Sequence, residues 1–103
     1  MRPILHGDVV AAARALYALP EVRRAQALDG MLRTAARADT YRLWTGRVHP
    51  RWGDGSLMVT ALGRRPPPEP PLNDTDYCGC MAMVFEALVG WLGRDRQPNR
   101  LRN

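Results

Sequence analysis

Residues 77–92 have the sequence YCGCMAMVFEALVGWL, which is the most apolar segment of the chain. It contains one charged residue, Glu86, and is shorter than the roughly 20 apolar residues that span a bilayer. Its apolar residues recur at steps of three and four, as on one face of an α-helix. They are Tyr77, Met81, Val84, Leu88 and Trp91 or Leu92, with Cys80, Phe85 and Val89 widening the stripe. This pattern predicts a buried helix at the centre of a small bundle.

A helical hairpin is predicted near the start of the chain. Asp8 is a suitable N-cap for a first helix over residues 9–19, which Pro20 ends. Proline also fits the first turn of a second helix, which reaches Trp44 before Gly46. The apolar stripe of this second helix comprises Val22, Ala25, Leu28, Leu32 and Ala35. The many alanines would let the two helices approach closely.

A short third helix and a stiff connection are predicted next. Ser56 can cap a helix over residues 57–62, with Gly63 as its stop. Residues 64–71 are rich in proline, which favours an extended polyproline conformation. The polar residues 73–76 then restart the chain as the apolar fourth helix, through capping and negative charge at its beginning.

The sequence therefore predicts an all-α, small four-helix domain. It consists of the hairpin, the short third helix and the apolar fourth helix, with two structured loops packed at one end. With 103 residues the chain is expected to form a single domain over residues 1–93, with a thin core. Residues 94–103 are expected to form a basic flexible tail.

Arginine dominates the charge of the chain. The chain has fifteen basic and ten acidic residues, which gives a net charge of +5. All fifteen basic residues are arginine, since the chain contains no lysine. A GC-rich genome would produce this bias without any function, whereas clustered arginines can also bind a phosphate backbone. The candidate nucleic-acid contacts are Arg23, Arg24, Arg33, Arg37, Arg64 and Arg65. Both explanations of the arginine excess stay open at this point.

Residues 49–57, HPRWGDGSL, bring polar, aromatic and glycine residues together between two predicted helices. Such a loop can bind an anion or a small ligand, because its glycines let backbone amides approach. The candidate ligand contacts are His49, Arg51, Trp52 and Asp54, together with Tyr77 from the fourth helix. The alternative is a structural plug in which Trp52 fills the gap between helices.

Cys78 and Cys80 suggest a second kind of site. With His49 they would offer thiolate and imidazole ligands, which suit zinc. On a helix, however, side chains two residues apart point about 200° apart, so both sulfurs could bind one metal only if the helix began after Cys80. Two free thiols in a reducing compartment are the alternative, and no cofactor is predicted.

The leading functional hypothesis is a non-enzymatic helical interaction or adaptor protein. Phosphate-loop, dinucleotide, nucleophile-elbow and paired-carboxylate motifs have no recognisable counterpart in the sequence. A protein partner or self-association is expected, and no membrane. The first residues do not resemble a secretory signal, so the cytoplasm is the expected compartment. The alternatives are an arginine-rich DNA- or RNA-binding protein, such as a regulator or a phage-type packaging subunit, and a metal or small-ligand site between the two loops.

Three short segments resemble a family of small bacterial proteins of unknown function. They are residues 6–10 (HGDVV), residues 49–57 and residues 76–80 (DYCGC). The resemblance covers roughly residues 1–92 and implies no activity.

Overall fold

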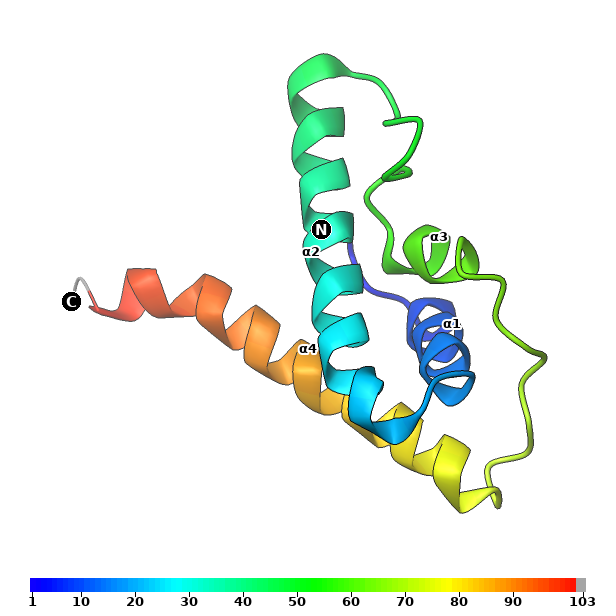
Figure 1. Ribbon diagram of the computed structural model, residues 1–103. Coiled ribbons are helices and arrows are strands. Elements are labelled where there is room, and N and C mark those ends of the chain that lie inside the picture. The colour runs from blue at the N-terminus through cyan, green and yellow to red at the C-terminus, as the bar shows by residue number, and fades with distance from the viewer. Residues whose placement is uncertain (102–103) are drawn as a thin grey trace.

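The protein is an all-α domain of four helices, as predicted. The computed structural model describes the backbone of residues 1–101 and the side chains of residues 1–94. The helices are α1 (His6–Tyr17), α2 (Glu21–Thr45), α3 (Leu57–Leu62) and α4 (Thr75–Leu101) (Figure 1). Within the described backbone no strand forms, and the one β-bridge joins His49 to Gly53. None of the helices in this part of the chain is long and apolar enough to cross a membrane.

The centre of the domain is α1 rather than the predicted fourth helix. Packing against α1 comes mainly from α3 and α4, and less from its hairpin neighbour α2. Small side chains make this close packing possible, because they let the neighbouring backbones approach. The buried residues of α1 are Asp8, Val9, Ala11, Ala12, Ala13, Ala15 and Leu16.

The first helix begins earlier than predicted, because Asp8 is not its N-cap but lies at the third position of the helix. Its helix starts at His6, so Asp8 lies inside the first turn. One carboxylate oxygen accepts the backbone N–H of Leu5 at 2.7 Å, and the other accepts the backbone N–H of Met58 at 2.8 Å. The side chain is buried. A single carboxylate therefore accepts backbone N–H groups at the N-terminal ends of both α1 and α3.

The bounds of α2 and α3 agree with the sequence pattern. Gly46 ends α2 in the left-handed conformation at φ 72°, which glycine adopts without strain. The Ser56 hydroxyl accepts the N–H of Val59 at 3.2 Å and so caps α3, as predicted. After α3 the positive φ of 53° falls at Arg65, whereas Gly63 is right-handed.

The proline-rich segment of residues 64–71, which we call the strap, connects α3 to the start of α4 and runs alongside α1. The guanidinium of Arg14 fastens it by donating to the carbonyl oxygens of Pro67 (2.7 Å) and Pro66 (3.5 Å). One oxygen of Asp74 then accepts the N–H groups of Asp76 and Tyr77, both at 3.1 Å, and caps α4. The strap therefore places the beginning of α4 against α1.

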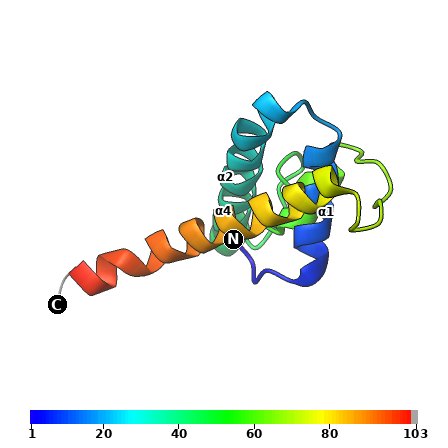
Figure 2. The ribbon, with the colours of Figure 1, turned by 90° about the horizontal axis from the view of Figure 1, so that it is seen from below.

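The fourth helix passes beneath α1 and α2 and projects beyond them (Figure 2). Its helical backbone continues to Leu101, past the end expected near Leu92. The flexibility of residues 94–103 stays a prediction, because the side chains from Asp95 onward and residues 102–103 lie outside the described part of the chain.

Candidate functional site

The loop between α2 and α3 (residues 46–56), which we call the His49 loop, is held in shape by its own side chains. Nδ1 of His49 accepts the backbone N–H groups of Arg51 and Trp52, both at 3.0 Å. The imidazole stacks on the Trp52 ring with 3.9 Å between centroids, and Tyr41 of α2 meets both rings edge-on. One nitrogen of His49 is thus used to shape the turn, and the stack anchors the loop on α2.

The second half of this loop lies directly against α2. Gly55 has φ 94°, and a Cβ atom there would lie 2.8 Å from the Cα of Asp39. The carboxylate of Asp54 accepts the N–H of Ser56 at 2.9 Å and pairs with Arg2 at 3.1 Å. The hydrogen bonds from Ser56 and the nearby Arg2 charge hold the pKa of Asp54 below its usual value.

Replacing Gly55 with alanine is expected to lower the free energy of unfolding by about 2 kcal/mol or more. The substitution would combine a strained positive φ with a clash against the α2 backbone. Urea denaturation followed by circular dichroism measures the change. Gly30→Ala is the matched control, because its Cβ would meet nothing within 4 Å, and it should raise stability by up to about 1 kcal/mol. Equal stability of Gly55→Ala and the wild type would show that the loop is not docked as described.

The structure does not bring the predicted loop and the start of α4 together. His49 contacts α2 at Tyr41, whereas α4 contacts α2 where Asp76 meets Arg24. These two positions on α2 are 17 residues apart in sequence, or about 25 Å along the helix axis. The two loops were expected to pack together at one end of the domain. They lie instead at opposite ends of α2.

Tyr77 and the two cysteines are consequently not neighbours of His49. Tyr77 is fully buried, donates its hydroxyl to Glu69 at 2.7 Å, and has its pKa raised by burial and by this carboxylate. Because α4 already begins at Thr75, Cys78 is exposed while Cys80 is buried, and burial raises the pKa of the Cys80 thiol. Across the described residues no group of three or more His, Cys, Asp or Glu side chains could hold a metal ion.

Arg24 differs from the other predicted nucleic-acid contacts, because it is buried and fully engaged inside the domain. It donates to two backbone carbonyls of the α1–α2 corner and forms a bidentate pair with Asp76. Arg33 lies on the surface in an ion pair with Asp29 at 2.9 Å. Arg65 is exposed at the beginning of the strap. The remaining three, Arg23, Arg37 and Arg64, line a groove on α2.

This groove, which we call the α2 groove, consists of three adjoining hollows of about 460, 370 and 540 Å³. The first two share Arg64 and the last two share Trp52. One wall is the exposed face of α2, and the other is formed by the His49 loop and α3. From α2 come Arg23, Gln26, Gly30, Thr34, Arg37, Tyr41 and Trp44; from the other wall come Arg51, Trp52, Thr60 and Arg64.

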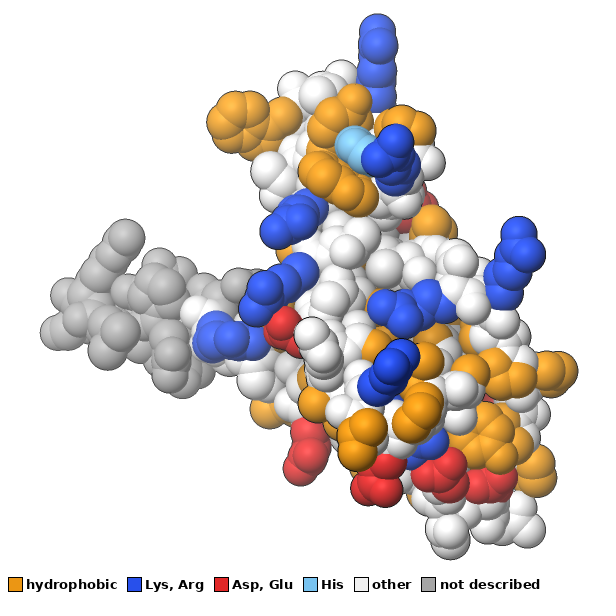
Figure 3. Space-filling model, in the orientation of Figure 1, with side chains coloured by type: hydrophobic (Ala, Val, Ile, Leu, Met, Phe, Trp, Pro, Cys, Tyr) orange, Lys and Arg blue, Asp and Glu red, His pale blue; other side chains and the backbone are white. Residues whose placement is uncertain are grey.

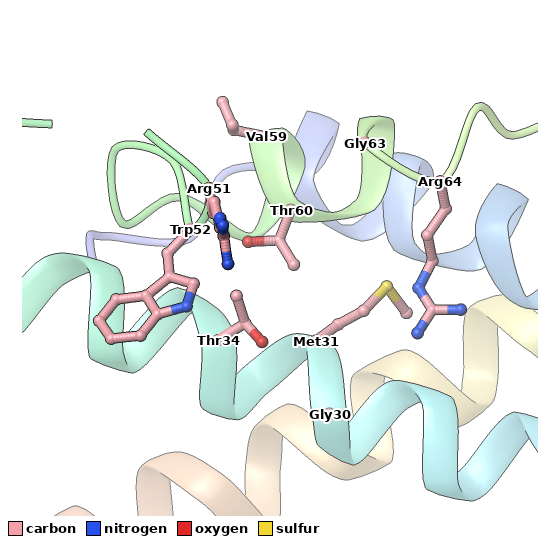
Figure 4. A pocket seen from close by; sticks show the side chains of 9 residues that line it. All are labelled: Gly30, Met31, Thr34, Arg51, Trp52, Val59, Thr60, Gly63 and Arg64. Carbon is pink, nitrogen blue, oxygen red and sulfur yellow. The ribbon is translucent and has the colours of Figure 1, made fainter. Parts of the chain in front are cut away.

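Hydrogen-bond donors converge on the central hollow. Arg51 and Arg64 approach it from opposite ends, and the indole nitrogen of Trp52 lies beside Thr34 (Figure 4). Arginine side chains gather on this face of the molecule, over α2 and the adjoining loop, while acidic side chains lie mostly toward its lower edge (Figure 3). Sequence reasoning singled out Arg51 and Trp52 for a different site and missed Thr34, Tyr41 and Trp44. Together with Arg37 these residues recur at steps of three, four and three along α2, which places them on one face of the helix and was the available signal.

A second exposed surface lies on α4. Phe85 and Val89 were expected to widen the core stripe, but they are 50% and 73% exposed. They belong to a separate row of exposed apolar residues, which we call the outer stripe. Its members are Cys78, Ala82, Phe85, Val89 and Leu92. The core side of α4 is formed by Tyr77, Cys80, Met81, Val84 and Leu88.

Comparison with known proteins gives a family and no activity. No curated protein and no solved structure matches the chain. A family model described as "Domain of unknown function (DUF7742)" matches residues 2–88, a span that includes the His49 loop, the whole α2 groove and most of the outer stripe. This confirms the resemblance to an uncharacterised family, while a bacterial origin stays a prediction. The chain belongs to the DUF7742 family of domains of unknown function.

Proposed function

We propose that this domain is a non-enzymatic interaction module that self-associates through the outer stripe of α4. The observation that carries the proposal is a row of exposed apolar side chains at heptad spacing. Successive members of the outer stripe are four, three, four and three residues apart. This average of 3.5 residues is the spacing of the a and d positions in helices that pack side by side.

The α4 helix carries two such stripes, and the domain covers one of them. Tyr77, Met81, Val84 and Leu88 repeat the same spacing one residue earlier and are buried in the core. One residue corresponds to a rotation of about 100° around the helix axis, so the two stripes lie next to each other. A contiguous apolar row on the surface of a small soluble domain is typical of an interaction site.

A second copy of the chain fits the outer stripe because the stripe complements itself. In an antiparallel pair a positions face d positions, which sets Phe85 against Val89 and Ala82 against Leu92 of the other copy. Each large side chain then meets a smaller one, as close packing requires. Parallel pairing would instead set Phe85 against Phe85 and Ala82 against Ala82. An antiparallel pair also has the two-fold symmetry of most homodimers.

The small core supports the same proposal. A domain of about 100 residues buries a smaller fraction of its surface on folding than a larger domain does. The outer stripe contains no charged residue that pairing would have to remove from water. Burial of Phe85, Val89 and Leu92 in a dimer would therefore add apolar contacts at little electrostatic cost.

Replacing Val89 with aspartate is expected to abolish dimer formation while leaving the monomer folded. The side chain is 73% exposed, so the monomer loses little packing, whereas a dimer would bury an unpaired charge at the centre of its interface. Size-exclusion chromatography with light scattering measures the mass, and circular dichroism checks the helical content. Val22→Asp is the matched control. Val22 was expected in the apolar stripe of α2, but it is 90% exposed and lies outside the outer stripe of α4. Equal association of both variants would contradict the proposal.

A further inference from the structure

We infer that the α2 groove binds single-stranded nucleic acid, with phosphates on its arginines and bases stacked on its aromatic side chains. This binding would be separate from the pairing of α4, because the groove and the outer stripe share no residue.

The first support is the sign of the charge along the groove. Arg23, Arg37, Arg51 and Arg64 line it, and none of its lining residues is acidic. Within residues 1–94 none of these four guanidinium groups has an ion-pair partner. The hydroxyl of Thr34 adds a neutral donor in the central hollow, whereas that of Thr60 donates to the carbonyl oxygen of Ser56 at 3.4 Å. A groove that offers donors and positive charge in this way suits a polyanion.

The second support is the aromatic end of the groove. Trp44 is 86% exposed, and Tyr41 and Trp52 line the same hollow. The Trp52 ring is held in place by its stack on His49. Trp44 is the exposed ring of the three, and Tyr41 and Trp52 are half-buried. Nucleic bases stack on accessible aromatic rings with little regard to sequence, and neighbouring arginines add to the attraction. The combination of arginine and aromatic side chains distinguishes a nucleic acid from other polyanions, which have no rings to stack.

The shape of the groove favours a single strand over a duplex. Along the central hollow the face of α2 is flanked by the His49 loop and α3, whereas a recognition helix that enters the major groove of duplex DNA presents a bare face. Stacking on Tyr41 and Trp44 also requires bases that are not already paired. From Arg23 to Trp44 the groove follows α2 for 21 residues, about 31 Å, which suits an oligonucleotide within the usual range of about 4–16 nucleotides.

The charge contribution is tested with the full chain and a fluorescein-labelled 15-nucleotide oligo(dT), by fluorescence anisotropy between low and moderate salt. Four phosphate contacts predict a slope of log affinity against log salt of about −3. In Arg37→Gln/Arg51→Gln the affinity should fall and the slope should shrink to about −1.5. The control Arg33→Gln/Arg65→Gln removes the same charge outside the groove and should keep the wild-type slope.

The stacking contribution is tested with Trp44→Ala under the same conditions. Loss of one stacked base predicts an affinity lower by roughly fivefold or more. Leu43→Ala is the matched control, because Leu43 is 68% exposed on the neighbouring position of α2 and does not line the groove. This variant should bind like the wild type. Both alanine variants should retain the wild-type melting temperature.

Three results would overturn the inference. They are an absence of salt-sensitive binding to oligo(dT), equal losses in the groove and control variants, and tighter binding to a duplex of the same length than to the single strand. Retained binding by the Val89→Asp monomer would show that the groove works without the α4 pair. A failure of α4 pairing therefore leaves the test of the groove intact.

Discussion

Replacing Arg24 with glutamine is expected to lower the free energy of unfolding by about 3 kcal/mol, a large part of the stability of a domain this small. Arg24 is a buried residue, with 8% of its surface exposed. Its guanidinium connects α1, α2 and α4. Its Nε donates to the carbonyl oxygens of Leu16 at 2.9 Å and Leu19 at 3.1 Å. Its two terminal nitrogens meet the Asp76 oxygens at 2.7 and 3.0 Å. Glutamine would leave two carbonyls of the α1–α2 corner without their partner.

Urea denaturation at neutral pH measures this loss. Arg23→Gln is the matched control, because Arg23 is the exposed neighbour on α2 and its replacement should change stability by less than about 0.5 kcal/mol. The Arg24 guanidinium lowers the pKa of Asp76, so the pair stabilises the fold fully above the unfolded carboxyl pKa of about 3.9. That contribution is lost as the pH falls through the lowered pKa of Asp76 in the folded state. The stabilities of the wild type and Arg24→Gln should therefore become more alike in acid. Equal stability of both variants at neutral pH would contradict this account of the corner.

Replacing Asp8 with alanine is expected to cost about 3 kcal/mol as well. Its buried carboxylate accepts two backbone N–H groups, from Leu5 at 2.7 Å and from Met58 at 2.8 Å. Bonds to a charged acceptor contribute about 1.5–3 kcal/mol each and are not fully additive. Alanine would remove both acceptors and leave a small cavity between the first turns of α1 and α3. The loss therefore affects two helix ends at once.

Thermal and urea unfolding measure the Asp8→Ala change, with Asp29→Ala as the control. Asp29 is a half-buried aspartate whose pair with the exposed Arg33 is open to solvent, so its loss should cost about 0.5 kcal/mol or less. Hydrogen exchange provides a local readout, because the Met58 amide should exchange faster in Asp8→Ala relative to core amides of α1. Unchanged protection of that amide would show that Asp8 does not support α3.

Sequence periodicity was sufficient to predict the helices. The spacing of apolar residues, Pro20, the Ser56 cap and Gly46 predicted α2 and α3 almost to the residue. These signals are local, since caps and breakers act within a single turn. The all-α class followed from them.

The packing was harder to predict because it depends on distant partners. Asp8 was correctly seen as a residue that stabilises a helix start, but its second acceptor bond reaches Met58, fifty residues away. On α4 the two stripes have the same spacing, so periodicity alone could not tell that Phe85 and Val89 face outward. Arg24 appeared in a row of surface arginines, and its burial depends on Asp76 of another helix.

The candidate site was only partly predictable for the same reason. Arg51 and Trp52 were recognised as interesting, yet their neighbours in space come from α2 and α3 and not from the start of α4. The alternative reading of His49 as part of a structural plug agrees with its hydrogen bonds to Arg51 and Trp52 and its stack on Trp52. The α2 groove forms only when two walls that are distant in sequence come together.

Sedimentation equilibrium of the wild-type chain over a range of concentrations measures its self-association, which the pairing of α4 requires. We expect an average mass that rises from the 11.6 kDa of one chain toward twice that value and fits a monomer–dimer equilibrium. A mass that stays at 11.6 kDa up to millimolar concentration would contradict it.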